Sequence, residues 1–298
     1  MAIERWARGL AVATGLSLLA LIAAGTLVHT HQAALSVPDW PLSYGKLILD
    51  RWPGNIFYEQ LHRVLAAISA LLLTVLLLVV RRQRATAAVR TLFALYLVQV
   101  AIGGVIVLRL NPPLVTAVHV VAAQLIACGV WLLAAGVFGE PGEGSAAVSG
   151  TRSRLAVVTA VTLLLQIVLG TLARHPPGKS VFVAALLGHI AVALVLVFLV
   201  PITSIRLAKR MRSLPGARKT SIALGLLFVA QIAVAIPLFI VSPEPLTEGP
   251  TPRFFPALHA AHVLLATLLL TASAYLATRR VAPAAAAGIG DTRTSRVP

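Results

Sequence analysis

The sequence predicts an all-α polytopic membrane protein, and three features of its composition and patterning agree on this. Of its 298 residues, 58% are hydrophobic and only 11% are charged, whereas soluble domains carry about 25% charged residues. Mean hydropathy is +0.92. The apolar residues form runs of about 20 positions, the length of a membrane-spanning helix, without the alternation of a membrane β-barrel. A water-soluble enzyme, a disordered chain and a disulfide-stapled secreted module are therefore excluded.

Eight stretches are long and apolar enough to cross a membrane. The first follows two arginines, but it is longer than a usual signal-peptide core and no small-x-small cleavage site closes it, so we expect a helix rather than a leader. The single cysteine, Cys128, lies inside an apolar run and cannot form an intramolecular disulfide. The predicted spans are 10–28, 62–80, 91–108, 114–137, 155–173, 183–204, 221–241 and 257–278.

The distribution of basic residues predicts the orientation of these spans. With a cytoplasmic N-terminus, 18 of the 25 Lys and Arg residues fall in cytoplasmic segments and six in outer segments. Positive residues concentrate on the cytoplasmic side of membrane proteins, so both termini are expected in the cytoplasm and the protein in the cell (inner or plasma) membrane. The net charge of +16 then reflects topology and contact with anionic lipid, and no nucleic-acid partner is expected.

The chain also looks duplicated, because three short segments recur in the same order. A four-helix repeat returns to its starting side, so we expect two parallel, pseudo-symmetric four-helix bundles related by an axis along the membrane normal. The recurring pairs are 25–27 with 170–172, 97–101 with 229–233, and 119–123 with 262–266. The predicted domains are an N-terminal half at 1–137, a cytoplasmic linker at 138–154, a C-terminal half at 155–280, and a disordered cytoplasmic tail at 281–298.

Each even-numbered span carries a histidine near its outer end: His62, His119, His189 and His262. A single such histidine is ordinarily a hydrogen-bonded interfacial residue, but ionisable groups inside spans usually face a bundle interior. Four at matching depth favour two pairs, His62 with His119 and His189 with His262, each able to supply two axial nitrogens to a haem iron. Zinc or copper is disfavoured, because no cluster of cysteine, methionine or carboxylate completes such a site.

The remaining histidines are less informative. His29, His31 and His175 lie where odd-numbered spans leave the membrane, and we expect them to be solvated loop residues. His259 precedes His262 by three residues and falls near the same helix face, so it is a rival ligand.

The first outer loop, His29 to Leu61, holds the other candidate residues. Its segment 36–45 contains two prolines, two aromatic residues and a glycine, which predicts a rigid turn, although an interfacial aromatic anchor suits the aromatics equally well. Glu59 lies three residues before His62 and shares its helix face. Its carboxylate is suited to act as a general acid, a general base or a stabiliser of a cation. It is equally suited to a purely structural role, as a negative charge that stabilises a helix N-terminus. The Arg63 guanidinium is suited to pair with a haem propionate or with a lipid phosphate.

The loop 36–45, with its Pro-Asp-Trp-Pro sequence, followed by the Glu59-x-x-His62-Arg63 motif resembles the haem A synthase family, whose members are membrane oxidoreductases. The resemblance covers nearly the whole chain: eight spans, two halves and a histidine on each even-numbered span. It implies oxidation of the C8 methyl of haem O to formyl, with water as the oxygen source, giving haem A for cytochrome oxidase assembly. The C-terminal half matches mainly through its histidines.

The resemblance also implies roles for individual residues. His62 and His119 would be axial ligands of the substrate haem, His189 and His262 would bind a haem b that passes electrons, and Glu59 would be the catalytic carboxylate beside the reacting carbon. The implied partners are membrane lipid, haem O, the haem O-producing farnesyltransferase and an electron donor or acceptor; a homo-oligomer is compatible with the sequence. Many bacterial members carry two cysteines in the first outer loop, whereas this loop has none, so a redox disulfide cannot take part.

Two other classes of function remain open. A diheme b-type membrane cytochrome that only relays electrons would need the same four histidines but not Glu59. A transporter or a non-catalytic assembly protein is less compatible, because the polar groups cluster at the outer ends of the spans rather than near the midplane.

Overall fold

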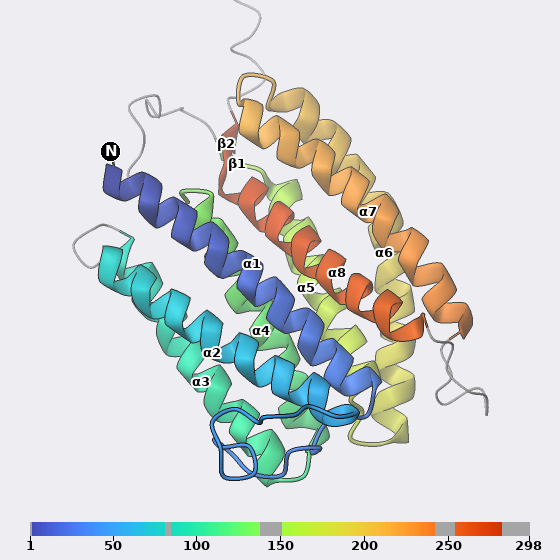
Figure 1. Ribbon diagram of the computed structural model, residues 1–298. Helices are drawn as coiled ribbons and strands as arrows, with labels where there is room; N and C mark the ends of the chain where they lie inside the picture. Colours follow the sequence, from blue (N-terminus) through green and yellow to red (C-terminus); the bar gives the residue numbers. More distant parts are fainter. Residues whose placement is uncertain (1, 81–84, 138–150, 242–253, 282–298) are drawn as a thin grey trace, which may run out of the picture.

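A computed structural model describes residues 2–80, 85–137, 151–241 and 254–281, and in this part of the chain eight long helices account for most residues (Figure 1). All eight are long and apolar enough to cross a membrane, as the sequence predicted. The helices are α1 (Ala2–Thr30), α2 (Asn55–Val80), α3 (Thr86–Leu108), α4 (Pro113–Ala134), α5 (Arg154–Arg174), α6 (Lys179–Arg210), α7 (Pro215–Val241) and α8 (Phe255–Thr278).

Most helices extend beyond the apolar windows that predicted them. Hydropathy marks only the residues that suit the bilayer interior, whereas backbone hydrogen bonding continues the helix into the polar flanks. The first span, expected at 10–28, belongs to a helix of 29 residues, and the sixth, expected at 183–204, to one of 32. The fourth span is the exception: α4 ends at Ala134 rather than at 137, because Gly136 turns the chain with a positive φ of 75°.

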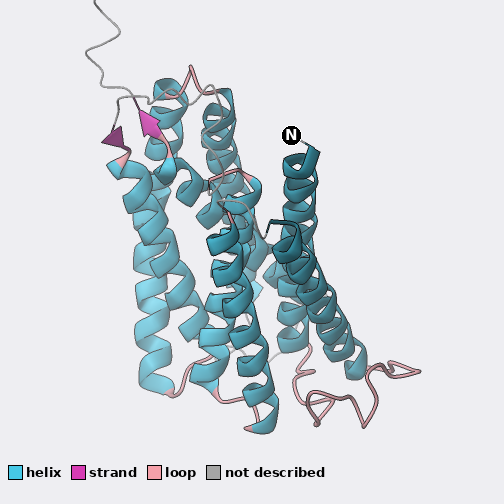
Figure 2. Cartoon of the chain, turned by 90° about the vertical axis from the view of Figure 1, so that its left-hand side faces the viewer, coloured by secondary structure: helices cyan, strands magenta, loops and turns pink. Residues whose placement is uncertain are grey.

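The helices pack as two rings of four. In the first ring α1 contacts α2 and α4, and α3 contacts α2 and α4; in the second, α5 contacts α6 and α8, and α7 contacts α6 and α8. The rings meet where α4 packs on α5 and α8, and where α1 packs on α8. Figure 2 shows the resulting bundle of long, roughly aligned helices from the side.

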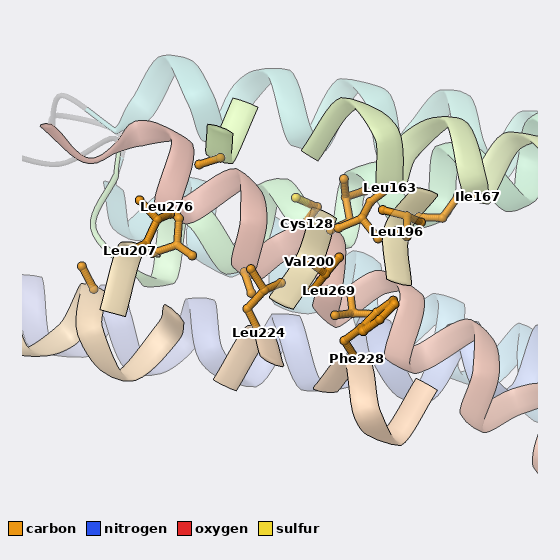
Figure 3. Packing of buried hydrophobic residues seen from close by; sticks show 14 of the residues in the cluster. Cys128, Leu163, Ile167, Leu196, Val200, Leu207, Leu224, Phe228, Leu269 and Leu276 are labelled. Carbon is orange, nitrogen blue, oxygen red and sulfur yellow. The ribbon is translucent and has the colours of Figure 1, made fainter. Parts of the chain in front are cut away.

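Apolar contacts fill the interior of each ring while large apolar side chains also cover its outside. In the second ring Leu163, Val200 and Leu269 are buried together, and Cys128 reaches this cluster from α4 (Figure 3). Cys128 is a free, buried thiol. The outward residues include Leu71, Leu194 and Phe198, each more than 60% exposed, as expected of helices whose outer surface meets lipid rather than water.

Polar side chains join helices at a few buried points. The Ser17 and Ser69 hydroxyls lie 2.7 Å apart between α1 and α2, and the Thr267 hydroxyl donates to the Gln124 side chain at 3.1 Å between α8 and α4. Such interhelical hydrogen bonds stabilise helix pairs where lipid offers no alternative partner. The second contact links the two rings.

One short pair of strands departs from the all-α expectation. β1 (Thr151–Arg152) pairs antiparallel with β2 (Arg280–Val281), at the end of the bundle where α1 begins. These residues belong to the predicted linker and to the junction with the predicted tail. The rest of those two segments, 138–150 and 282–298, lies outside the described residues.

Candidate haem-binding site

The four predicted histidines lie at one end of the bundle, which we call the loop end because the segment 31–54 covers part of it. Each sits within about three turns of the start of its helix, because α2, α4, α6 and α8 all begin at this end. All four side chains are partly buried.

His189 and His262 form a close pair inside the second ring. Their ring centroids lie 6.5 Å apart, with the ring planes at 54° to one another. Imidazole nitrogens bind first-row metals at about 2 Å, so two axial imidazoles on one iron have centroids about 6 to 6.5 Å apart. The rival ligand His259 instead has its ring edge-on to Phe255, with centroids 6.0 Å apart. The structure thus pairs His262 rather than His259 with His189.

The His189 ring is seated on the backbone of α5. Its Nδ1 lies 3.0 Å from the carbonyl oxygen of Gln166, and since a carbonyl only accepts, this contact is a hydrogen bond when Nδ1 carries the proton. One turn further on, a Cβ added at Gly170 would lie 2.7 Å from Cε1 and 2.9 Å from Nδ1 of His189. Gly170 therefore leaves the space that the ring occupies, and with Nδ1 protonated, Nε2 is the ring nitrogen that carries the lone pair.

The His62 ring packs against α1 in a similar way. A Cβ added at Gly25 would lie 3.0 Å from Cε1 and 3.2 Å from Nδ1 of His62. The Leu21 carbonyl, four residues before Gly25, is the corresponding backbone acceptor, although the contact falls short of normal hydrogen-bond geometry and leaves Nδ1 without a hydrogen-bond partner among the described residues. The local arrangement matches that of His189, where Gln166 stands four residues before Gly170.

His119 follows the pattern more loosely on α3. A Cβ added at Gly103 would lie 3.4 Å from its Cε1, and the Gln99 backbone faces the ring four residues earlier. The Gln99 side chain also donates to the His119 carbonyl at 2.7 Å. His62 and His119 lie close enough to interact electrostatically. Three of the four histidines thus lie beside a glycine, and at His189 the carbonyl four residues before that glycine also contacts Nδ1.

Glutamine amides lie beside the second pair. Gln166 Nε2 is 3.1 Å from His189 Nε2, and Gln231 Nε2 is 3.1 Å from His262 Nδ1 and 3.3 Å from its Nε2. The Oε1 atoms of both glutamines are buried without a hydrogen-bond partner among the described residues. Buried polar atoms normally find partners, so these incomplete contacts indicate a polar site that a further group would complete.

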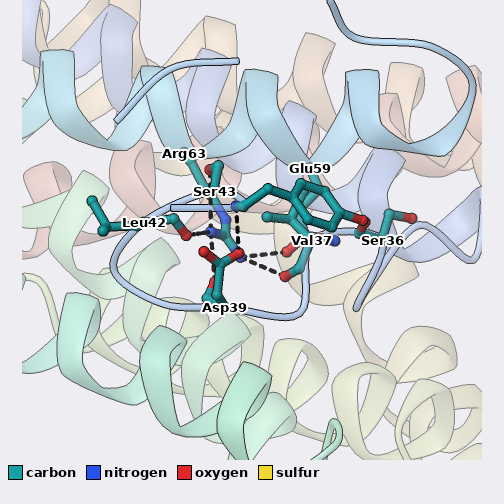
Figure 4. A network of polar contacts seen from close by, with 8 residues as sticks. Ser36, Val37, Asp39, Leu42, Ser43, Glu59 and Arg63 are labelled. Atoms are coloured by element: carbon teal, nitrogen blue, oxygen red, sulfur yellow. Dashed lines mark hydrogen bonds and ion pairs between the residues drawn. The ribbon is translucent and has the colours of Figure 1, made fainter. Parts of the chain in front are cut away.

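Glu59 and Arg63 are joined by a buried ion pair at the start of α2 (Figure 4). Arg63 Nη2 donates to Glu59 Oε1 at 2.7 Å, and the backbone N–H of Val37 donates to Glu59 Oε2 at 2.9 Å. Glu59 is 5% exposed, so a lone charge there would be costly without these partners. Both oxygens of the predicted catalytic carboxylate are therefore engaged by neighbouring groups.

Arg63 is directed at the first outer loop. Its Nη1 donates to the carbonyls of Asp39 at 2.9 Å and Leu42 at 2.7 Å, and its Nη2 donates to the carbonyl of Val37 at 2.9 Å. The guanidinium, predicted to face a propionate or a lipid phosphate, thus holds the backbone of the segment 37–42 in place (Figure 4).

Further contacts fix the rest of this loop. The backbone N–H groups of Gly45 and Tyr44 donate to the Asp39 carboxylate at 2.9 and 2.7 Å, and these hydrogen bonds lower the pKa of Asp39 below its ordinary value. The Trp40 indole lies against the backbone of α3, where a Cβ at Gly104 would be 2.8 Å from Cδ2. The sequence predicted a rigid turn, and the structure shows that it is anchored on both α2 and α3.

The expectation that His29 and His175 are solvated is wrong. His175 is only 9% exposed, and its ring centroid lies 4.2 Å from that of His29. Burial, and then the neighbouring Arg174 guanidinium, lower the pKa of His175 to about 4. Sequence alone placed these residues at helix ends but did not show that α1, α5 and α8 converge there. His31, by contrast, stacks on Tyr58, with ring centroids 3.9 Å apart.

No family model matches the sequence, and no curated protein matches it. Among the described residues, no three or more His, Cys, Asp or Glu side chains gather in a group that could hold a metal ion. Two imidazoles with ring centroids 6.5 Å apart instead suit a metal that brings its own equatorial ligands, as haem iron does. The residues present fit such a group.

Proposed function

We propose that this chain is a haem A synthase-like oxidoreductase of the cell membrane, which oxidises the C8 methyl of haem O to the formyl group of haem A. We further propose that its two rings of helices are pseudo-symmetric halves with both termini in the cytoplasm. The loop end then lies on the outer side of the membrane. The basic residues of the sequence and the recurrence of the seated histidines in both rings support this arrangement.

The repeated seat of the histidines is the observation that carries this proposal. His62 lies against Gly25 in the first ring and His189 against Gly170 in the second, each with a helix carbonyl one turn earlier. An Nδ1–H held toward a carbonyl fixes the ring orientation and presents Nε2 as the ligand. A histidine ring packed against a helix glycine at two sites, together with a 6.5 Å imidazole pair in the second ring, supports one haem per ring.

The proposed roles follow from position. His62 and His119 hold the substrate haem beside the first outer loop, whereas His189 and His262 hold a haem b that exchanges electrons. Bound haem supplies redox-active iron. Glu59 lies three residues before His62 on α2, and Arg63 and the Val37 N–H orient its carboxylate while Arg63 also fixes the loop. The first outer loop is fixed at this end of the first ring by Arg63 and by the contact of Trp40 with α3.

A diheme cytochrome that relays electrons without modifying haem is the second candidate, and one observation favours it. Both Glu59 oxygens already accept hydrogen bonds, from Arg63 and from the Val37 backbone. A carboxylate engaged in this way can serve purely to anchor the loop. The two candidates therefore differ in whether haem chemistry depends on Glu59.

The test is haem conversion by the full chain in cells that produce haem O. If Glu59 is catalytic, Glu59→Gln lowers the yield of haem A by about 100-fold or more, the range for loss of a general acid or base, while total haem content stays unchanged. Asp50→Asn is the matched control, because Asp50 is an exposed loop carboxylate paired with Lys46. Undiminished conversion by Glu59→Gln would remove the catalytic role, and no conversion by the unaltered chain, with haem bound, would favour the electron relay.

A further inference from the structure

The first ring has a layer of buried polar side chains on the side of its histidine pair that faces away from the loop end, and we call this layer the polar floor. It comprises Gln99 and Tyr96 on α3 and Ser69 on α2, with exposed fractions of 7%, 2% and 0%. Gln99 precedes Gly103, the glycine beside the His119 ring, by four residues. Since α3 ends at the loop end, Gln99 lies about one helical turn deeper in the bundle than that glycine, and Tyr96 about two. Ser69 likewise lies about two turns deeper than His62 on α2.

The polar floor spans the inside of the first ring. The Gln99 side-chain amide donates to the His119 carbonyl of α4 at 2.7 Å, and the Tyr96 hydroxyl donates to the Ala66 carbonyl of α2 at 2.6 Å. The other atom of the Gln99 amide, Oε1, is buried and has no hydrogen-bond partner among the described residues. Because the amide nitrogen is held by α4, this oxygen is an acceptor fixed inside the ring. Buried acceptors normally have a donor, so we expect a ligand with a hydroxyl or N–H group at this depth.

In the second ring the positions that correspond to Tyr96 and Ser69 are apolar. The recurring segments 97–101 and 229–233, extended by one residue, place Phe228 at the position of Tyr96. Alignment of His62 with His189 places Leu196 at the position of Ser69. Phe228 and Leu196 are both buried in the apolar cluster of the second ring. The two rings therefore resemble one another at the histidines and differ in the layer beneath them.

The other glutamines with an unpartnered Oε1 atom are placed differently. In the second ring, the Gln166 and Gln231 amides contact ring nitrogens of His189 and His262. A haem iron would take up one nitrogen of each ring, so these amides have to turn when haem binds. In the first ring, Gln60 lies two residues before His62 and about 200° around α2 from it. The Gln99 amide is instead held by a backbone carbonyl, which haem binding leaves in place.

The haems proposed for the two rings differ in one hydrogen-bonding group. Haem O carries a hydroxyethylfarnesyl side chain, whose hydroxyl lies on the half of the macrocycle opposite the two propionates, whereas haem b has a vinyl group there. Charged propionates are costly in the bilayer interior, so they face the loop end and the opposite half of the macrocycle faces the interior. In the first ring that half faces the polar floor, and in the second ring it faces Phe228 and Leu196.

We propose that Gln99 binds the hydroxyl group of haem O and thereby selects haem O over haem b in the first ring, an inference that rests on the proposed function. The hydroxyl donates to Gln99 Oε1, and Tyr96 and Ser69 keep the surrounding layer polar. A site built to bond a substrate hydroxyl rejects the analogue that lacks it, because the buried acceptor is then left unpaired. Gln99 is therefore a residue that determines substrate specificity.

The test compares haem O with haem b as ligands of the first site, at His62 and His119. The full chain in detergent is titrated with each haem, and occupancy of the first site is followed by the absorption that His62→Ala removes. The readout is the ratio of the two dissociation constants. The farnesyl tail contributes equally in every variant, and loss of the bond to the His119 carbonyl weakens both haems alike, so a change in this ratio reports the hydroxyl.

The unaltered chain is expected to bind haem O more tightly than haem b at the first site. Gln99→Met should lower this preference by about three- to tenfold, the net contribution of one neutral hydrogen bond. Gln99→Asn keeps an amide but withdraws Oε1 from the site, and should lower the preference as well. Gln231→Met is the matched control, because Gln231 holds the corresponding position in the second ring, and it should leave the ratio at the first site unchanged.

The outcomes separate this inference from the proposed function. Haem b bound at His189 and His262 reports in the same molecule whether each Gln99 variant is folded. An unchanged ratio in both Gln99 variants, or equal binding of haem O and haem b at the first site of the unaltered chain, would overturn the inference while leaving haem binding intact. No haem uptake by the unaltered chain would overturn the proposed function as well.

Discussion

At the scale of single residues, the histidines could be found in the sequence but their surroundings could not. Four imidazoles at matching depth stand out in an apolar chain, because an ionisable group inside a span is costly. The glycines beside the histidines do not stand out in the sequence, because the chain has 21 glycines. Only the structure shows that Gly25 and Gly170 face His62 and His189, although both open the same Gly-Thr-Leu repeat. That repeat was the one signal in the sequence that marked them.

The distances between the glycines and the histidine rings predict that haem retention falls by different amounts when each glycine is replaced by alanine. Gly170→Ala places its Cβ 2.7 Å from the His189 ring, Gly25→Ala 3.0 Å from His62, and Gly103→Ala 3.4 Å from His119. Overpacking a filled site costs about 1–3 kcal/mol, so haem retention should fall most for Gly170→Ala and least for Gly103→Ala. Haem content after purification measures this.

Gly9→Ala is the control for that series, because a Cβ at Gly9 meets nothing within 4 Å. It should leave the haem content of both sites unchanged. Equal haem content in Gly170→Ala and Gly9→Ala would show that the glycine does not position the ring.

At the scale of elements, the sequence predicted the helices well and the first outer loop poorly. Long apolar runs specify a spanning helix because every backbone group must be hydrogen-bonded inside the segment. The loop conformation depends instead on contacts between residues far apart in the chain. Arg63 was expected to face a ligand, yet its donors reach carbonyls 21 to 26 residues earlier. Nothing local in the sequence indicates these partners.

Arg63 is therefore predicted to be the main anchor of the first outer loop. Arg63→Met removes its hydrogen bonds and leaves the Glu59 carboxylate buried without its countercharge, a loss of about 3 kcal/mol for a buried pair. The loop should become accessible to added protease at rates well above those of the unaltered chain. Cleavage within 31–54 in detergent, followed by mass spectrometry, measures this.

Arg109→Met is the matched control, because Arg109 is an exposed arginine that caps α3 at the same end of the bundle. It should leave the cleavage rate unchanged. A loop in Arg63→Met as resistant as in the control would contradict the anchoring role.

At the scale of the whole molecule, the helices pack as two rings of four, and the duplication expected from the sequence stays a prediction. Within each ring, the packing of successive helices against one another follows from chain order, since helices joined by short connections pack side by side. The contact between the rings was not predictable in detail. The hydrogen bond between Gln124 and Thr267, which links the two rings, joins residues 143 positions apart.

The proposed orientation predicts which ends of the molecule are accessible from outside the cell. Leu47→Cys, in the exposed first loop, should react in intact cells with a maleimide that cannot cross membranes. Ser213→Cys, in the connection between α6 and α7, should react only after the membrane is opened. The native Cys128 is buried and serves as the unlabelled background. The opposite pattern would invert the topology.

Whether each ring of helices holds a haem is decided by the spectrum of the purified full chain. We predict low-spin haem with two axial imidazoles at two sites: His189→Ala abolishes one set of optical and electron paramagnetic resonance signals, and His62→Ala abolishes the other. Separation of the extracted haems should give haem b together with haem O or haem A. A folded protein without Soret and α bands, or one whose haem signals survive both substitutions, would contradict the account.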